Sequence, residues 1–178
     1  MALTKLGLRQ ARAAAERLVR MGVSQIYSSP LRRALQTAHI ISQRLKVPVQ
    51  ELEELIDIDF GDWQGLSPQE AKERNGGLYQ LWSASPHLVR FPGGESLGDV
   101  RERVSRALQM LVARHPEETV ILVSHMVACR VMVCAVLGID NSHFWQIGQD
   151  VCAINIFETR GNDLALRLLN DTCHLRGL

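Results

Sequence analysis

The run Thr-Val-Ile-Leu-Val at residues 119–123 constrains the fold most, because it stops abruptly at Ser124 and His125. A β-branched apolar run, followed by an apolar helical stretch at 127–137, predicts a buried parallel strand that leads into a buried helix. His125 then lies at the carboxyl end of a strand, where open α/β sheets bind their ligands. Taken alone, His125 is better explained as a hydrogen-bonded core residue, so the rest of the chain decides its role.

Composition excludes several classes of partner. The chain has 178 residues, of which 46% are hydrophobic, and this is enough for one globular domain. A formal net charge of +1 gives no reason to expect nucleic acid or an anionic membrane as partner. No apolar run approaches the roughly 20 residues of a membrane span. Charged residues such as Arg9, Arg12 and Glu16 also make a signal peptide unexpected.

The cysteines form no C-x-x-C pair, and we expect them to be reduced core residues of a cytoplasmic protein. They are Cys129, Cys134, Cys152 and Cys173. His125 and Cys129 have a spacing that would allow a shared metal on a helix, but no second pair accompanies them. We therefore predict packing for Cys129, and neither a metal nor a cofactor for the chain.

Helical and strand patterns alternate along the sequence. They predict helices over 4–21, 31–45, 69–74 and 78–83, and strands over 26–28, 47–52 and 119–123. Two further strands at 152–157 and 164–169 flank turn residues 160–163 and predict a closing hairpin. Strands interleaved with helices predict an α/β, three-layer α/β/α sandwich with a mostly parallel sheet.

A long amphipathic helix is predicted to begin after Ser96, which has capping-box spacing from Asp99. Three arginines of this helix, Arg101, Arg103 and Arg106, are expected to face solvent, because a charged helix face is usually solvated.

Two arginines, Arg32 and Arg33, occupy the first turn of the predicted helix that follows strand 26–28. Cations there oppose the helix dipole, so their presence needs a reason. Backbone N–H groups at a helix start and a guanidinium fork together suit the oxygens of a phosphate. One arginine of the pair is readily explained as a surface residue, but two in succession less so.

The stretch that contains these two arginines resembles a known family. The run 28–38 is similar to the S-x-L-x-R-A-x-x-T-A signature of the histidine phosphatase superfamily, in its phosphoglycerate-mutase-like branch. The other similar stretches, in the family's order, are residues 3–7, 55–65, 93–96 and 123–125. Each is weak alone, but together they cover nearly the whole chain. The resemblance implies a phosphomonoester hydrolase for a phosphorylated small molecule, acting through a phosphohistidine.

The resemblance also implies roles for single residues. Arg33 matches the phosphate-binding arginine, and His125 matches the second active-site histidine. Met126 stands where the family commonly has glycine, and its backbone N–H remains available to the substrate. Asp57 matches the catalytic proton donor, which is usually Glu, and the shorter carboxylate leaves Asp59 and Glu54 as alternatives.

The largest departure concerns the nucleophile. In this family the nucleophilic histidine belongs to an R-H-G motif that ends the first strand, upstream of the stretch matched by residues 3–7. No histidine of the chain has that context. We therefore expect a single domain, 1–178, that lacks its first strand and is impaired or inactive. Removing a central strand exposes ladder edges, which a homodimer would cover.

Three alternatives remain. A scaffold without its nucleophile would serve as a binding module. A phosphoglycerate mutase is less favoured, because those members carry a longer insertion before the segment matched by 93–96. A serine hydrolase at Ser96 fits G-x-S-x-G, but the preceding Pro92 and Gly93 argue against the strand that such a nucleophile requires.

Overall fold

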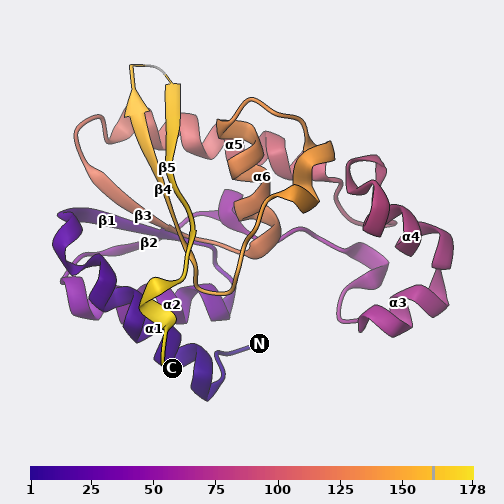
Figure 1. Cartoon of the computed structure of the whole chain (residues 1–178), viewed down its shortest axis with the longest axis horizontal. Helices are drawn as coiled ribbons and strands as arrows, with labels where there is room; N and C mark the ends of the chain where they lie inside the picture. The colour runs from indigo at the N-terminus through magenta and orange to yellow at the C-terminus, as the bar shows by residue number, and fades with distance from the viewer. Residues whose placement is uncertain (162) are drawn as a thin grey trace.

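The computed structural model describes residues 1–161 and 163–178. Its centre contains a parallel three-stranded sheet and a separate antiparallel hairpin (Figure 1). The sheet has the order β2-β1-β3, with β1 at Val23–Ser28, β2 at Val49–Glu51 and β3 at Thr119–Val123. The hairpin consists of β4, Ile154–Arg160, and β5, Asp163–Asp171. The predicted α/β fold with a mostly parallel sheet is confirmed.

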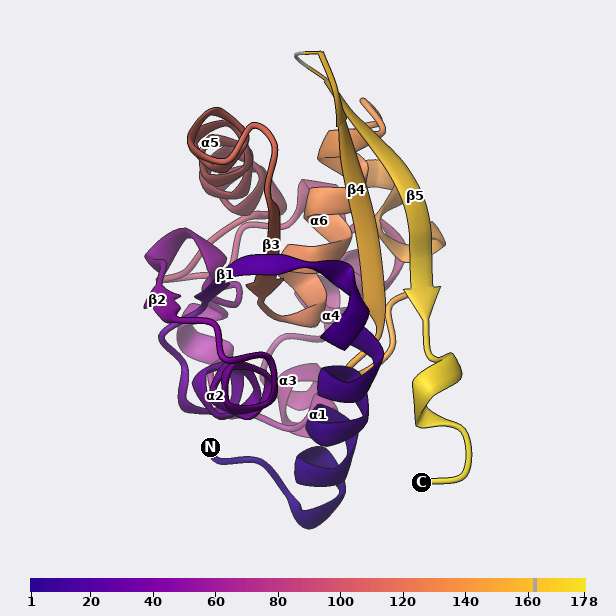
Figure 2. The same ribbon diagram turned by 90° about the vertical axis from the view of Figure 1, so that its left-hand side faces the viewer.

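Helices cover both faces of the three-stranded sheet (Figure 2). On one face lie α1, Lys5–Leu18, and α2, Arg32–Leu45. On the other lie α5, Leu97–Arg114, and α6, Met126–Val136. β3 serves both layers, because Ile121 and Val123 pack towards α1 and α2 while Val120 packs towards Leu111 of α5. This alternation explains why β3 is apolar at every position except its first residue.

The element boundaries follow the local chemistry. Thr4 caps α1 by accepting a hydrogen bond from the Gly7 amide at 3.1 Å, and Ser96 forms a complete capping box with Asp99. β4 begins two residues later than predicted, after Cys152, whose φ of 60° is left-handed and interrupts an extended strand. The predicted turn at 160–163 includes residue 162, which lies outside the described part of the chain.

Two short helices, α3 at Pro68–Arg74 and α4 at Gly76–Ala84, project from the sandwich (Figure 1). The rings of Trp82 and Phe91 lie 5.1 Å apart, and those of Trp82 and Phe144 lie 5.6 Å apart. Phe60, Trp63, Tyr79 and Trp145 join the same network of aromatic contacts. The connection before Gly93 therefore packs as a small aromatic core.

All four cysteines are free thiols. Within residues 1–161 and 163–178, no helix combines the length and apolarity that crossing a bilayer requires.

Candidate active site

Arg33 and His125 meet at one edge of the parallel sheet. β1 and β3 are parallel neighbours, so the residues that follow each strand lie at the same edge of the sheet. Arg33 lies in the first turn of α2 after β1, and His125 is the N-cap of α6 after β3. The Arg33 Nε–H donates to His125 Nδ1 at 3.1 Å. Two residues 92 positions apart are thus in direct contact, and one phosphoryl group could reach both.

The contact fixes the tautomer of His125. Arg33 always donates, so Nδ1 must accept, and the ring proton resides on Nε2, which lies 2.7 Å from the Ser29 hydroxyl. Burial lowers the pKa of His125 to about 4, aided by the positive charges of Arg33 and Arg103. His125 is therefore a neutral imidazole at pH 7, and it donates a hydrogen bond without carrying a charge.

The Asp57 carboxylate completes the cluster. Its Oδ2 lies 2.9 Å from Arg33 Nη2 and 3.8 Å from His125 Nδ1. Burial raises the pKa of Asp57 above its ordinary range, although the Arg33 charge opposes the shift. A raised pKa suits a carboxyl group that must carry a proton to a leaving group.

The two alternative carboxylates are placed differently. Asp59 is exposed and accepts a hydrogen bond from the Gly61 amide at 2.8 Å. The Glu54 side chain lines the neighbouring cavity, and its backbone carbonyl is held by Arg103 at 2.7 Å. The geometry therefore favours Asp57 among the three.

Arg103 corrects one expectation. It does not face solvent, because it is only 9% exposed and reaches from α5 into the segment that carries Asp57. Its guanidinium donates to the Glu95 carboxylate at 2.9 and 3.1 Å. It also donates to the carbonyls of Glu54, Ile56 and Asp57 at 2.7, 2.8 and 3.2 Å. Arg103 is a positioning residue that holds the backbone of the acid segment.

The other two arginines of this helix differ from each other. Arg101 is likewise held, by the Ile139 carbonyl at 2.7 Å, so only Arg106 is exposed as expected.

A second clamp joins the acid segment to the Gly-Gly-Glu-Ser stretch. The Glu95 amide donates to the Asp59 carbonyl, and the Glu95 carboxylate accepts from the Asp59 amide, both at 2.9 Å. Gly94 permits this approach, because a Cβ at that position would lie 2.3 Å from the Asp59 carbonyl oxygen. The two motifs therefore act as one structural unit beside the site.

Two cavities adjoin the cluster. One of about 850 Å³ contains Asp57, Arg33, Phe60 and Gln64 in its wall. The other, of about 800 Å³, extends from His125 between β3 and β4. Met126 is 51% exposed and lines the second cavity, so its side chain shapes the site from the start of α6.

Metal and serine chemistry receive no geometric support. Burial raises the pKa of the Cys129 thiol to about 12, and no group of three potential metal ligands gathers in the described residues. The Ser96 hydroxyl donates to Asp99 at 2.6 Å as part of its helix cap, and no named strand immediately precedes it. His174 follows Ser96 in the chain order that a serine hydrolase requires, but it contacts the Cys152 carbonyl at 3.1 Å.

Comparisons with known proteins place this geometry in context. Phosphoserine phosphatase 1 of Hydrogenobacter thermophilus is 38% identical over 173 residues, which are 97% of this chain and 82% of that protein. Mycobacterial relatives are 33% identical to this chain, which spans 48% of their length, so those proteins are longer.

Two solved structures are also similar. Bacillus stearothermophilus YhfR matches with a TM-score of 0.94 at 29% identity, covering 98% of this chain and 87% of that one. A mycobacterial glucosyl-3-phosphoglycerate phosphatase in complex with inorganic phosphate matches with a TM-score of 0.89 at 28% identity, covering 97% and 89%. The model of the histidine phosphatase superfamily, branch 1, matches residues 1–172, and the chain belongs to that family.

Proposed function

We propose that the site serves phosphomonoester hydrolysis of the histidine phosphatase type on a phosphorylated small molecule. The convergence of Arg33, Asp57 and His125 within 3.8 Å at the sheet edge is the observation that carries the proposal. Arg33 supplies a planar cationic fork for phosphate oxygens, and His125 supplies a neutral donor. The names of the similar proteins, a phosphoserine phosphatase and a glucosyl-3-phosphoglycerate phosphatase, support the same reaction class.

The reaction proceeds in two transfers. A nucleophilic imidazole nitrogen attacks phosphorus, an N–P bond forms, and the P–O ester bond breaks. Protonated Asp57 gives its proton to the departing alkoxide. Water then attacks phosphorus, Asp57 takes the proton back, and the N–P bond breaks to release inorganic phosphate. Arg33 and His125 stabilise the phosphoryl oxygens in both transition states.

The nucleophile is a histidine other than His125. Neither ring nitrogen of His125 offers a free lone pair for attack, because Nδ1 accepts from Arg33 and Nε2 carries the ring proton, which is available to Ser29 or to a phosphoryl oxygen. In residues 1–161 and 163–178, the hydrogen bonds of Arg33 and Asp57 include none to the other five histidines, which are His39, His87, His115, His143 and His174. We therefore propose that the 178 residues by themselves bind phosphate but turn over esters little or not at all.

The test combines phosphate binding with hydrolysis of para-nitrophenyl phosphate. Titration calorimetry should show that Arg33→Ala weakens phosphate binding by roughly tenfold or more, because a charge-assisted donor is lost. Arg32→Ala, an exposed neighbour in the same helical turn, is the matched control and should bind as the unaltered chain does.

Two results would contradict the proposal. Equal losses in the two arginine variants would remove Arg33 from the binding site. Hydrolysis by the unaltered chain that disappears in His125→Ala would contradict the proposed lack of turnover, because the site would then act without a further histidine.

Substrate class is tested by competition, since turnover is not expected. O-phosphoserine and 3-phosphoglycerate should displace inorganic phosphate, and their ranking reports which alcohol the cavity beside Asp57 accommodates. With a nucleophile present, release of inorganic phosphate identifies a phosphatase, whereas phosphoryl transfer to a second alcohol identifies a mutase. The free thiols agree with the cytoplasmic location that we propose.

A further inference from the structure

The guanidinium of Arg130, in the second turn of α6, has buried donors that the rest of the described chain leaves unpaired. Its Nε and Nη1 atoms are buried, and among residues 1–161 and 163–178 nothing accepts a hydrogen bond from either atom. The arginines of the candidate active site are held differently, since Arg33 pairs with Asp57 and Arg103 pairs with Glu95. Buried donors without an acceptor are uncommon in folded proteins, so this side chain requires an explanation.

Two aromatic rings hold the Arg130 guanidinium in place. Its Cζ lies 5.2 Å from the centroid of the Phe144 ring and 5.0 Å from that of the Trp145 ring. Such contacts attract the positive charge, but an aromatic ring offers no oxygen to the five N–H donors of a guanidinium. Trp145 is fixed in turn, because its Nε1–H donates to the Trp82 carbonyl at 2.9 Å. The charge is therefore positioned, while its buried donors still lack acceptors.

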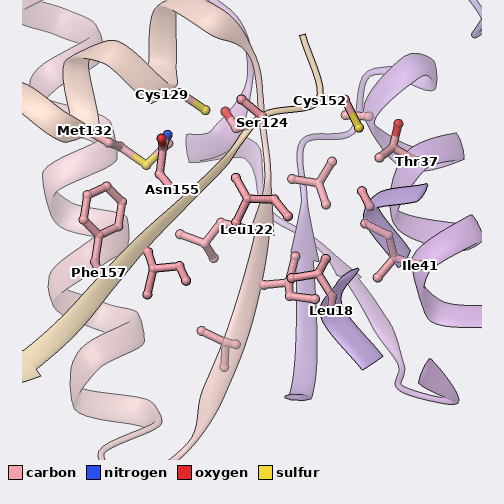
Figure 3. A pocket seen from close by; sticks show the side chains of 18 of the residues that line it. Leu18, Thr37, Ile41, Leu122, Ser124, Cys129, Met132, Cys152, Asn155 and Phe157 are labelled. Carbon is pink, nitrogen blue, oxygen red and sulfur yellow. The ribbon is translucent and has the colours of Figure 1, made fainter. Parts of the chain in front are cut away.

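Arg130 lies close to the candidate active site along α6. His125 is the N-cap of this helix, Met126 is its first residue, and Arg130 follows Met126 by four residues. Residues four apart share one helix face, and long side chains lean towards the helix N-terminus, so Arg130 extends beside Met126 in the direction of His125. Figure 3 shows Cys129, the residue before Arg130, at the cavity that extends from His125. Arg130 is therefore about one helical turn, or about 5.4 Å, from the start of the helix.

The charges near Arg130 determine which ligand suits it. Burial lowers the pKa of Arg130, and the nearby Asp150 charge opposes that shift. Asp150 lines the cavity that contains His125, and its carboxylate accepts a hydrogen bond from the Asn170 side chain at 3.0 Å. An anion bound to Arg130 would therefore lie near a carboxylate, which favours a singly charged group over a doubly charged one. A carboxylate carries one charge, and its two oxygens match the planar edge of a guanidinium.

We propose that Arg130 binds a carboxylate on the alcohol part of the substrate, while Arg33 and His125 hold its phosphoryl group. This inference rests on the proposed function and narrows the substrate class to small phosphorylated hydroxy acids. Such acids carry both anionic groups on a short carbon skeleton, and their span is similar to the rise of one helical turn. The unbranched Met126 side chain is 51% exposed, so its rotation admits the carboxylate to Arg130.

The first experiment compares ligands that differ in the carboxylate. O-phosphoserine is paired with O-phosphoethanolamine, and 3-phosphoglycerate is paired with glycerol 3-phosphate. Displacement of inorganic phosphate, measured by titration calorimetry, should show that the unaltered chain binds the carboxylate member of each pair roughly tenfold tighter or more. Equal affinities within both pairs would overturn the proposal.

Matched variants assign this preference to one residue. Arg130→Met keeps an unbranched side chain beside Phe144 and Trp145 and should remove the preference for the carboxylate ligands. Arg20→Met, at an exposed position after α1, removes the same charge and should keep the preference. A preference that persists in Arg130→Met would overturn the proposal and assign the buried donors to solvent.

Nuclear magnetic resonance gives a readout on the unaltered chain, which remains decisive if a variant fails to fold. The Arg130 Nε–H signal, assigned by its loss in Arg130→Lys, should shift on addition of O-phosphoserine and stay in place with O-phosphoethanolamine. A signal that does not move at high O-phosphoserine concentration would overturn the proposal. A shift produced by a diol bisphosphate and not by O-phosphoserine would overturn the choice of a carboxylate in favour of a second phosphate.

The two proposals fail in different ways. Phosphate binding that survives unchanged in Arg33→Ala contradicts the proposed function, and the Arg130 Nε–H signal then decides by itself whether a carboxylate binds beside Met126. Weaker phosphate binding in Arg33→Ala, together with an unmoved Arg130 signal, leaves the proposed function standing and overturns the carboxylate site.

Discussion

His125 shows how a single contact fixes the chemistry of a side chain. Its neutral state follows from burial and from an arginine that occupies Nδ1. The His125 Nε2–H donates a hydrogen bond to the hydroxyl of Ser29, which is fully buried. A histidine in this state binds an anion through its N–H dipole. It would take up a proton only when a dianion offsets the nearby positive charge.

Removing His125 should change the pH dependence of stability. An unfolded histidine with its ordinary pKa of 6.5 takes up a proton as the pH falls, whereas folded His125 does not until about pH 4. The folded state therefore loses up to about 3 kcal/mol of stability from this residue between those pH values. Urea unfolding across this range should show a flatter profile for His125→Gln. Identical profiles would contradict the depressed pKa.

At the scale of elements, the acid segment depends on its neighbours. Its described helical pieces are short 3-10 turns, at Glu53–Leu55 and Gly61–Trp63, and no long helix or strand forms part of it. Arg103 of α5 and the clamp through Glu95 fix it from outside. The position of the Asp57 carboxylate is thereby set by contacts far from it in sequence.

Arg103→Met should destabilise the chain by about 3 kcal/mol or more, because Glu95 would lose its charge partner in a largely buried pair. Arg106→Met, three residues later on the same helix, removes only an exposed pair with Glu102 and should cost less than about 0.5 kcal/mol. Urea denaturation measures both. Similar losses in the two variants would show that the buried contacts carry no special weight.

Gly94→Ala should also destabilise the chain, by about 2 kcal/mol or more, because its Cβ meets the backbone of the acid segment. Gly77→Ala is the matched control, since it lies in helix α4 with only one atom near the added Cβ. That substitution should stabilise the chain by about 0.5 kcal/mol. A thermal melt in which both variants behave alike would contradict the clamp.

The sequence predicted those elements whose signals are local. The β-branched run 119–123 became β3, and the capping pair Ser96 and Asp99 set the start of α5. The sequence singles out Arg33 because this residue belongs to a contiguous signature. The burial of Arg103 was missed, because its partners lie up to 49 residues away and a solvated arginine has the same helical spacing. Division of the strands into two sheets likewise depends on long-range pairing that no local pattern contains.

The whole molecule combines packed apolar clusters with a cavity between the two sheets. Aromatic contacts and apolar clusters fill the α5 and α6 side, while a cavity of about 800 Å³ lies between β3 and β4. Helix α6 contacts β5 of the hairpin. Among the described residues no ladder joins the hairpin to the three-stranded sheet, so packing of side chains attaches it.

This architecture predicts binding of the hydrophobic dye ANS to the folded chain at neutral pH, because apolar side chains line an accessible cavity. Ile156→Lys, in the wall of this cavity, should reduce the fluorescence of the dye more than Leu169→Lys, on the exposed part of β5, does. Fluorescence no higher than that of a close-packed control protein would show that the cavity is inaccessible in solution.

The ion pair between Arg33 and Asp57 has a consequence for timing. Arg33 is the charge that holds down the pKa of Asp57 against the effect of burial. An arriving phosphate competes for the same guanidinium, and as Arg33 turns to it, the carboxyl group loses its stabilising cation and its proton affinity rises. Binding of the substrate therefore favours the protonated form of Asp57, which is the form that donates to the leaving group, and Arg33 opposes that protonation while the site is empty.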